Sequence, residues 1–181
     1  MMKILNIHGY KGNAANAAYN ALSECGFEVI SLQLDHDRTS PEKLMQMLSS
    51  QFTNNFCSSV VGTSLGGFYA ALISAKYECP AVLINPCLMP FLHLPKLGYR
   101  DDDGILEYIR LFSGIADAEN GNISMIIGGK DEVIDTHDFN RSIFQNEKYV
   151  YVPEGMHSGA TMPLEDIFRD HMEGFFGDVL P

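Results

Sequence analysis

Residues 58–72 read SSVVGTSLGGFYAAL, in which an apolar run, a glycine-rich turn and a helix-forming stretch follow one another. The run Ser58 to Gly62 predicts a short strand, and the residues from Leu65 onward predict a helix. Ser64 then lies at a sharp turn between strand and helix, in a strained backbone conformation that pushes its hydroxyl outward. Glycine is needed on both sides of the serine, at positions 62 and 66, because larger side chains would collide as the turn closes.

Two other interpretations of this motif remain open. The same residues fit an ordinary turn rich in glycine and serine, or a phosphate-cradling loop of the G-x-G-x-x-G type. A nucleotide-binding loop is disfavoured because no lysine follows Gly67 and no acidic partner for a ribose is evident. The strand before the motif and the helix after it favour a nucleophilic serine, since that motif requires both.

Strands and helices alternate along the rest of the chain. Runs rich in Val, Ile and Leu predict five further strands, at Lys3 to His8, Phe27 to Leu34, Ala81 to Asn85, Ile123 to Gly128 and Lys148 to Val152. Helices are expected at Ala14 to Cys25, Pro41 to Phe52, Leu65 to Lys76, about Gly104 to Phe112, Thr136 to Phe144 and Pro163 to Phe176. Gly26 marks the end of the first helix, and Ser40 offers its hydroxyl as the N-cap of the second.

This order of elements predicts the fold class. Regular alternation indicates an α/β three-layer sandwich, with a mainly parallel six-stranded sheet and helices on both faces. With 181 residues, 46% of them hydrophobic, the chain can bury one substantial core, so a single domain over 1–181 is expected. An irregular stretch at about 86–103, rich in Pro, Leu and Phe, predicts a short apolar insert over one edge of the sheet.

Composition excludes several classes of partner. Twelve Lys and Arg face 23 Asp and Glu, a formal net charge of -11, which opposes binding to nucleic acid because each phosphate contact needs a basic group. The apolar runs are too short to span a membrane, and the N-terminus has no cleavage site of a signal peptide. The four cysteines lack metal-ligand spacing and are expected to be reduced thiols. A cytoplasmic protein without metal is therefore expected.

A serine hydroxyl is a weak nucleophile unless a base removes its proton. His157 lies in the loop after the last predicted strand, at the same edge of the sheet as Ser64, which indicates the base. Asp131 follows the preceding strand and would hold the imidazole in the correct tautomer. Glu132 and Asp135 are nearby rivals, but a solvated acidic loop accounts better for both. The remaining histidines fit surface or structural positions: His8, His36, His93, His137 and His171.

The acyl oxygen needs two hydrogen-bond donors as negative charge develops on it. The backbone N–H of Leu65, at the start of the helix, is placed to be one of them. The other should come from the loop after the first strand, where Gly9 lets the backbone turn and the N–H of Tyr10 would point toward the acyl oxygen. His8 is expected to fix this loop through its ring.

These motifs together resemble the α/β-hydrolase superfamily, and specifically the small bacterial YqiA-like esterases. The likeness runs nearly from end to end, through His8-Gly9-Tyr10, residues 62–67, Asn85-Pro86-Cys87 with Pro90, residues 130–135 and residues 154–157. It implies a reduced hydrolase fold and esterase activity on small acyl esters. It also implies these roles: Ser64 as nucleophile, Asp131 as acid, His157 as base, and the N–H groups of Tyr10 and Leu65 as oxyanion donors.

The apolar insert would lie over the nucleophile and form an acyl or alcohol pocket. Its candidate lining residues are Leu88, Met89 and Phe91, with Lys11 and Met156 from neighbouring loops. A cluster of apolar side chains that simply packs on the sheet edge explains the insert equally well. Residues 101–103, all Asp, are expected to form a solvated turn.

The sequence therefore predicts a serine hydrolase that cleaves carboxylic esters or thioesters of small acyl groups through an acyl-enzyme on Ser64, without a cofactor. A hypothesis from a different class is a catalytically idle hydrolase-like scaffold that binds a small molecule or a protein partner, because a fold alone does not fix function.

Overall fold

A computed structural model describes residues 2–118, 122–144 and 148–177 of the chain. Its centre is a six-stranded sheet in the order β2-β1-β3-β4-β5-β6, and every neighbouring pair of strands is parallel. The strands are β1 (Lys3–Ile7), β2 (Glu28–Ser31), β3 (Ser59–Thr63), β4 (Ala81–Ile84), β5 (Ile123–Gly128) and β6 (Lys148–Val152). The prediction of a mainly parallel six-stranded sheet is confirmed.

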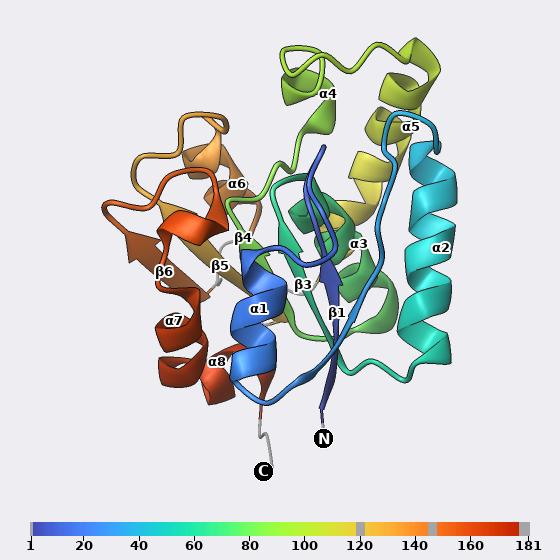
Figure 1. Ribbon diagram of the computed structural model, residues 1–181. Coiled ribbons are helices and arrows are strands. Elements are labelled where there is room, and N and C mark those ends of the chain that lie inside the picture. Colours follow the sequence, from blue (N-terminus) through green and yellow to red (C-terminus); the bar gives the residue numbers. More distant parts are fainter. Residues whose placement is uncertain (1, 119–121, 145–147, 178–181) are drawn as a thin grey trace.

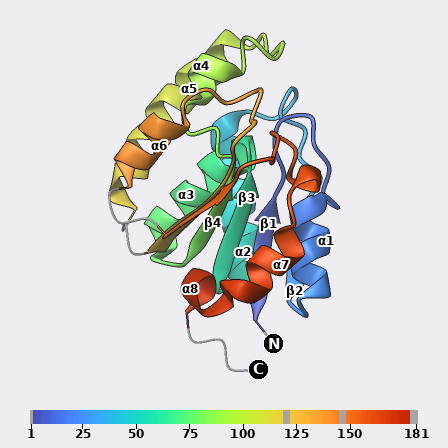
Figure 2. The ribbon, with the colours of Figure 1, turned by 90° about the vertical axis from the view of Figure 1, so that its left-hand side faces the viewer.

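Helices cover both faces of this sheet, as Figures 1 and 2 show. One face is covered by α1 (Ala17–Glu24), α7 (Leu164–Asp170) and α8 (Met172–Phe176). The other face is covered by α2 (Pro41–Asn54), α3 (Leu65–Tyr77), α5 (Asp102–Phe112), the 3-10 helix η1 (Ser113–Asp117) and α6 (His137–Ile143). Two short elements lie near the carboxyl ends of the strands, α4 (Pro90–His93) and the 3-10 helix η3 (Gly159–Thr161).

The strands are apolar at consecutive positions because each face of the sheet has its own core. Leu5 and Ile7 pack on the side of α2 and α3, whereas Ile4, directly before Leu5, packs on the side of α1 and α7. Successive side chains of a strand point to opposite faces, so a strand covered on both sides needs no polar alternation. This arrangement buries all four residues of β4.

Several predicted boundaries differ from the structure. β2 ends at Ser31 rather than Leu34, because the chain leaves the sheet and the Leu34 N–H donates to the His8 ring at 2.9 Å. The predicted final helix is divided into α7 and α8 at His171, whose backbone is not helical, and Phe168 and Phe176 from the two parts reach the same core.

The helix caps differ as well. The Ser40 hydroxyl makes no capping hydrogen bond at α2, although Pro41 begins that helix as predicted. Asn16 caps α1 instead, accepting from the Tyr19 N–H at 2.9 Å. Gly26 follows α1 with a positive φ of 87°, as a glycine after a helix should.

Residues 101–103 are exposed, but they open α5 rather than form a turn, and carboxylates are favourable in a first helical turn.

The predicted insert at 86–103 is largely packed rather than open. Cys87, Leu88 and Leu94 are buried, and the Phe91 ring contacts Phe112 of α5 with ring centroids 5.5 Å apart. The segment therefore caps the face of the sheet that carries α3 and α5. In the part of the chain that the structure describes, no helix has the length and apolar character needed to cross a bilayer.

Candidate active site

Ser64 occupies the turn between β3 and α3 in a conformation that a residue with a side chain rarely adopts. Its φ is 54° and its ψ is -120°, and the residue is 8% exposed. The glycines predicted to permit this turn do so by close backbone approach. A Cβ on Gly62 would lie 2.2 Å from the Gly66 oxygen, and one on Gly66 would lie 2.0 Å from the Ile7 oxygen. The local sequence thus holds the hydroxyl at the carboxyl end of β3.

His157 reaches Ser64 from the loop after β6. Its Nε2 lies 3.0 Å from the Ser64 Oγ, within hydrogen-bonding distance. Asn85, at the end of β4, is fully buried and donates to the backbone oxygens of Met156 and His157 at 2.9 and 3.1 Å. The Glu132 carboxylate accepts from the His157 N–H at 3.0 Å. Three separate loops therefore fix the position of the imidazole.

Asp131 follows β5 and contacts the other ring nitrogen of His157. Both of its carboxylate oxygens lie 3.0 Å from the His157 Nδ1, and its side chain is only 1% exposed. The backbone N–H groups of Val133 and Ile134 donate to Oδ1 at 2.8 and 2.9 Å. A second imidazole, that of His137, contacts Oδ2 through Nε2 at 2.8 Å.

The hydrogen bonds decide the ionisation of Asp131. Burial by itself would raise the pKa of this carboxyl, but hydrogen bonds from His137, from His157 and from the two backbone N–H groups hold that pKa well below its usual range. The carboxylate is therefore charged at neutral pH. The two predicted rivals of Asp131 for the role of the acid have other partners. Glu132 accepts from the backbone of the His157 loop, and Asp135 pairs with His93 at 3.0 Å.

The loop after β1 lies directly against the nucleophile. A Cβ on Gly9 would come within 2.9 Å of the Ser64 Cβ, so only glycine fits there. His8 is buried and fixes the loop as predicted: its Nδ1 lies 2.8 Å from the Gly9 oxygen, and its Nε2 accepts from Leu34. Within the described ranges, the backbone N–H groups of Tyr10 and Leu65 donate to no protein acceptor.

The Tyr10 side chain, unlike the backbone N–H of the same residue, has a hydrogen-bond partner among the described residues. Its hydroxyl donates to the Asp37 carboxylate at 2.6 Å. Burial, together with that carboxylate, raises the pKa of Tyr10 to about 12, so the hydroxyl stays protonated. Lys11 lies over the Tyr10 ring at 4.9 Å, and its Nζ is 3.5 Å from the Leu97 oxygen.

A cleft of about 390 Å³ opens beside Ser64 and His157. Its walls come from the loop after β1, the start of α1 and the loop after β6, and none of the described Lys, Arg, Asp or Glu residues lines it. The lining residues are mostly small or neutral: His8, Gly9, Tyr10, Gly12, Asn13, Ala15, Asn16, Ala17, Ala18, Thr63, Ser158, Gly159 and Ala160, with Ser64 and His157.

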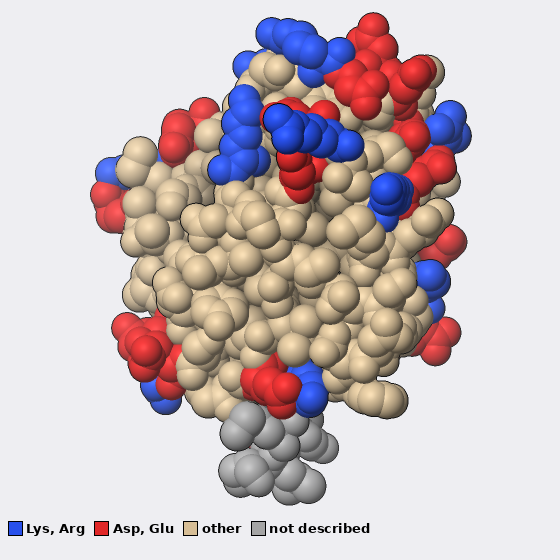
Figure 3. Space-filling model, turned by 45° about the vertical axis from the view of Figure 1, so that its right-hand side comes forward, with Lys and Arg blue, Asp and Glu red and all other residues tan. Residues whose placement is uncertain are grey.

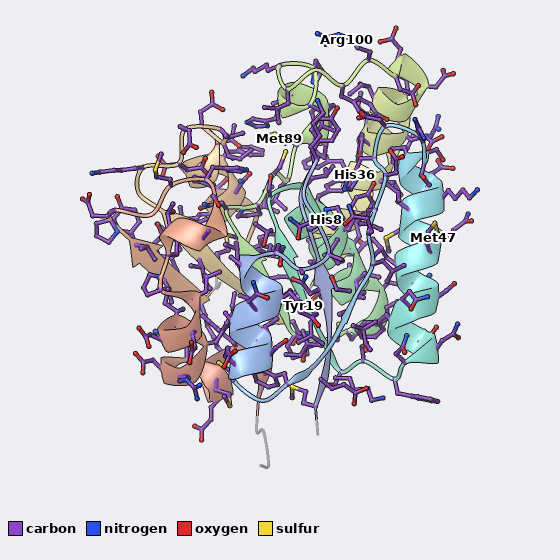
Figure 4. The ribbon with its side chains drawn as sticks, viewed as in Figure 1. His8, Tyr19, His36, Met47, Met89 and Arg100 are labelled. Atoms are coloured by element: carbon purple, nitrogen blue, oxygen red, sulfur yellow. The ribbon has the colours of Figure 1, made fainter. Side chains whose placement is uncertain are left out.

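The five residues predicted to line a substrate pocket are not among those that line this cleft. Leu88 is buried in the core on the α3 side, and Met89, beneath α4 in Figure 4, is buried as well. Phe91 packs on α5, Met156 points to solvent, and Lys11 lies in a neighbouring hollow with Arg100. Apolar character alone does not distinguish a residue that lines a cavity from one that fills a core.

Charge lies outside this cleft. Figure 3 shows basic side chains next to acidic ones at the end of the molecule that carries α4, with a broad uncharged band below them. Arg100 stands at the outer tip of that end in Figure 4. Among the described residues, no group of three His, Cys, Asp or Glu side chains is arranged to hold a metal ion.

Sequence reasoning missed two residues of the site, His137 and Asn85. In the sequence, His137 is one of several histidines that fit surface or structural positions, and its one local signal is its position six residues after Asp131. Asn85 was noted only within a motif at the end of a strand. Its φ of 42° lies in the left-handed region that asparagine tolerates better than most residues.

A model of the uncharacterised protein family UPF0227 matches residues 3–141. Among solved structures, Est1E from Butyrivibrio proteoclasticus superposes with a TM-score of 0.66 at 16% identity, over 94% of this chain and 88% of that one. A monoacylglycerol lipase from Paleococcus ferrophilus gives 0.67 at 12% identity, over 94% and 91%. The α/β hydrolase MGS-MChE2, from a lagoon-sediment metagenome, gives 0.66 at 15% identity, over 96% and 90%. At such identities the likeness concerns the fold.

Proposed function

The chain belongs to the uncharacterised protein family UPF0227 and has the α/β-hydrolase fold, and from this premise we propose that it is a serine hydrolase. Its substrates are carboxylic esters or thioesters of small acyl groups. One observation carries the proposal: Ser64 Oγ, the His157 imidazole and the Asp131 carboxylate form a continuous series of hydrogen bonds, each 3.0 Å long. A buried, strained serine bonded to an oriented base is the arrangement that nucleophilic catalysis needs.

The proposed reaction begins when His157 takes the Ser64 proton while Oγ attacks the acyl carbonyl. The negative charge that develops on the carbonyl oxygen accepts hydrogen bonds from the N–H groups of Tyr10 and Leu65, and the N-terminal end of α3 also favours it. The C–O or C–S bond then breaks as His157 returns the proton to the leaving alcohol or thiol. Asp131 stays ionised and stabilises the imidazolium.

An acyl-enzyme on Ser64 remains after the first half of the reaction. His157 removes a proton from a water molecule, whose oxygen attacks the acyl carbon, and collapse of the second tetrahedral intermediate releases the carboxylic acid. The proton returns to Ser64 Oγ, so no cofactor is consumed. This cycle needs only groups that already lie together at one edge of the sheet.

The cleft supports the small-substrate part of the proposal. Its volume of about 390 Å³ suits a short acyl chain and a small alcohol, and its lining contains no charged carboxylate, ammonium or guanidinium group. Neutral esters therefore fit the lining better than substrates that carry several phosphates.

The test compares Ser64→Ala with wild type on p-nitrophenyl acetate and butyrate, and labels both with a fluorophosphonate probe. Wild type is expected to turn over the esters and to be labelled. Ser64→Ala should lose about 10⁴-fold or more in kcat and remain unlabelled, because the nucleophile is absent. Ser50→Ala, on the exposed side of α2, is the matched control and should behave as wild type.

Unchanged circular dichroism in Ser64→Ala would attribute the loss to chemistry rather than to folding. A wild-type protein that neither turns over an ester nor reacts with the probe would instead support an idle scaffold. Activity retained in Ser64→Ala would exclude the acyl-enzyme mechanism altogether.

A further inference from the structure

His137 is hydrogen-bonded to Asp131, one of the proposed catalytic residues, although it takes no part in the mechanism above. It opens α6, its Nε2 lies 2.8 Å from Asp131 Oδ2, and its side chain is 15% exposed. Its other ring nitrogen, Nδ1, is buried and has no hydrogen-bond partner among the described residues. A single buried carboxylate is thus shared between two imidazoles.

The surroundings fix the tautomer of His137. The Asp131 carboxylate is ionised and can only accept, so the nitrogen that faces it, Nε2, carries a proton. A proton on Nδ1 as well would bury an N–H without an acceptor, whereas an unbonded lone pair at that position costs less. His137 therefore donates to Oδ2 from Nε2.

We propose that His137 is a positioning residue, which holds the Asp131 carboxylate in place against His157 and limits how strongly that carboxylate favours the imidazolium form of His157. The inference rests on the proposed function, because it concerns His157, the base of the proposed reaction. A carboxylate that already accepts from His137 has less negative charge to offer the second imidazole. The carboxylate then holds the imidazolium form of His157 less strongly, which leaves the imidazole available as a general base.

Other titratable groups lie on the elements around this pair and remain in every variant. They are Glu132 and Asp135 on the loop before α6, Asp138 and Arg141 on α6, Cys87, His93 and Lys96 on the segment after β4, and Ser64 beside His157. Because they are unchanged, a shift on substitution of His137 reports the loss of its own hydrogen bond.

The experiment substitutes His137 with residues that lack or retain the donor. His137→Leu removes the donor, and His137→Asn has an amide too short to reach Oδ2. His137→Gln can place its amide N–H near the position of the imidazole Nε2. The imidazole of His157 is titrated by NMR in each protein, its resonance being assigned by its absence in His157→Gln. His171→Gln, an exposed histidine between α7 and α8, is the control.

We expect the NMR titration curve of the His157 imidazole to move to higher pH in His137→Leu and His137→Asn, and to return toward the wild-type curve in His137→Gln. The acid limb of the kcat/KM profile should move upward by the same amount, with about a tenfold loss at a pH below the new limb. His171→Gln should change neither quantity. If His137→Leu does not fold, His137→Asn gives the donor-free result.

An unmoved His157 titration in the folded donor-free variants would overturn the inference, as would an equal shift in His137→Gln. The NMR titration needs no turnover, so the two proposals fail separately. A protein without esterase activity whose His157 titration still shifts would reject the hydrolase and keep the role of His137. Ester turnover together with an unchanged His157 titration in the donor-free variants would keep the hydrolase and reject the role of His137.

Discussion

At the scale of single residues, the buried histidines differ in what their ring nitrogens contact. His8 uses both nitrogens in hydrogen bonds, one to the Gly9 oxygen and one from the Leu34 N–H after β2, and His137 uses one, to Asp131. His36 engages neither among the described residues, although it is only 3% exposed. Its ring lies edge-on to that of His8, with centroids 5.6 Å apart, and stacks on that of Tyr69, with centroids 6.2 Å apart. A ring in this position can remain buried only while it is neutral.

This environment predicts a loss of stability in mild acid. Burial, and next the neighbouring His8, lower the pKa of His36 to about 4, from 6.5. The unfolded chain therefore takes up the proton first as the pH falls from 6.5 toward 4, and folding weakens over that window. From pH 7 to pH 5 the free energy of unfolding should fall by about 2 kcal/mol on account of His36.

His36→Phe keeps an aromatic ring but cannot titrate, so its urea-unfolding free energy should decline by about 2 kcal/mol less than that of wild type between the two pH values. The exposed His171→Gln serves as a control and should decline as wild type does. Equal declines in His36→Phe and wild type would refute the assignment.

At the scale of elements, two helices begin in different ways. The Asn16 side chain accepts from the Tyr19 N–H at 2.9 Å and also from the Asn6 amide at 3.2 Å, so it ties the start of α1 to β1. Ser40 precedes α2 without a capping hydrogen bond from its hydroxyl. A good capping residue in the sequence thus marks where a helix starts without establishing that its side chain caps it.

This contrast predicts unequal costs for two similar truncations. Asn16→Ala should lower the free energy of unfolding by about 1–2 kcal/mol, because it removes an acceptor from the first turn of α1. Ser40→Ala should cost under about 0.5 kcal/mol, as for an exposed substitution without a partner. Chemical denaturation of both variants measures the difference, and equal costs would contradict the observed capping pattern.

At the scale of the whole molecule, one sheet separates two cores. Phe168 is fully buried among α1, α7 and the sheet, whereas Tyr69 and Tyr108 are fully buried on the opposite side. The strands belong to both cores, so neither face can lose its packing without exposing the other through the sheet. The chain is therefore expected to unfold as one cooperative unit.

Phe168→Ala tests this expectation. It should cost about 3–5 kcal/mol, because a large buried side chain leaves a cavity. The unfolding midpoint should fall equally by far-UV circular dichroism and by tyrosine fluorescence, although the substitution lies on the face away from Tyr69 and Tyr108. Phe56→Ala removes the same side chain from a position that is 85% exposed, and should shift the midpoint little. Separate midpoints for the two probes would show independent unfolding of the faces.

The residue sequence by itself determined the parallel sheet and the turn at Ser64. Apolar runs of strand length alternate with helical stretches. Such patterns are local and can be recognised without knowing which segments pack together in the fold. The meeting of Ser64, Asp131 and His157 was also predictable, because each follows a strand and the carboxyl ends of parallel strands share one edge.

Only the tertiary structure decided which side chains surround that edge. His137 meets Asp131 because of the way α6 packs on the sheet, and Asn85 holds the His157 loop across more than seventy residues of chain. Leu88 and Met89 turn into the core, whereas small residues of the loops after β1 and β6 line the cleft. Such contacts depend on the orientation of whole elements, and no local period in the sequence encodes that orientation.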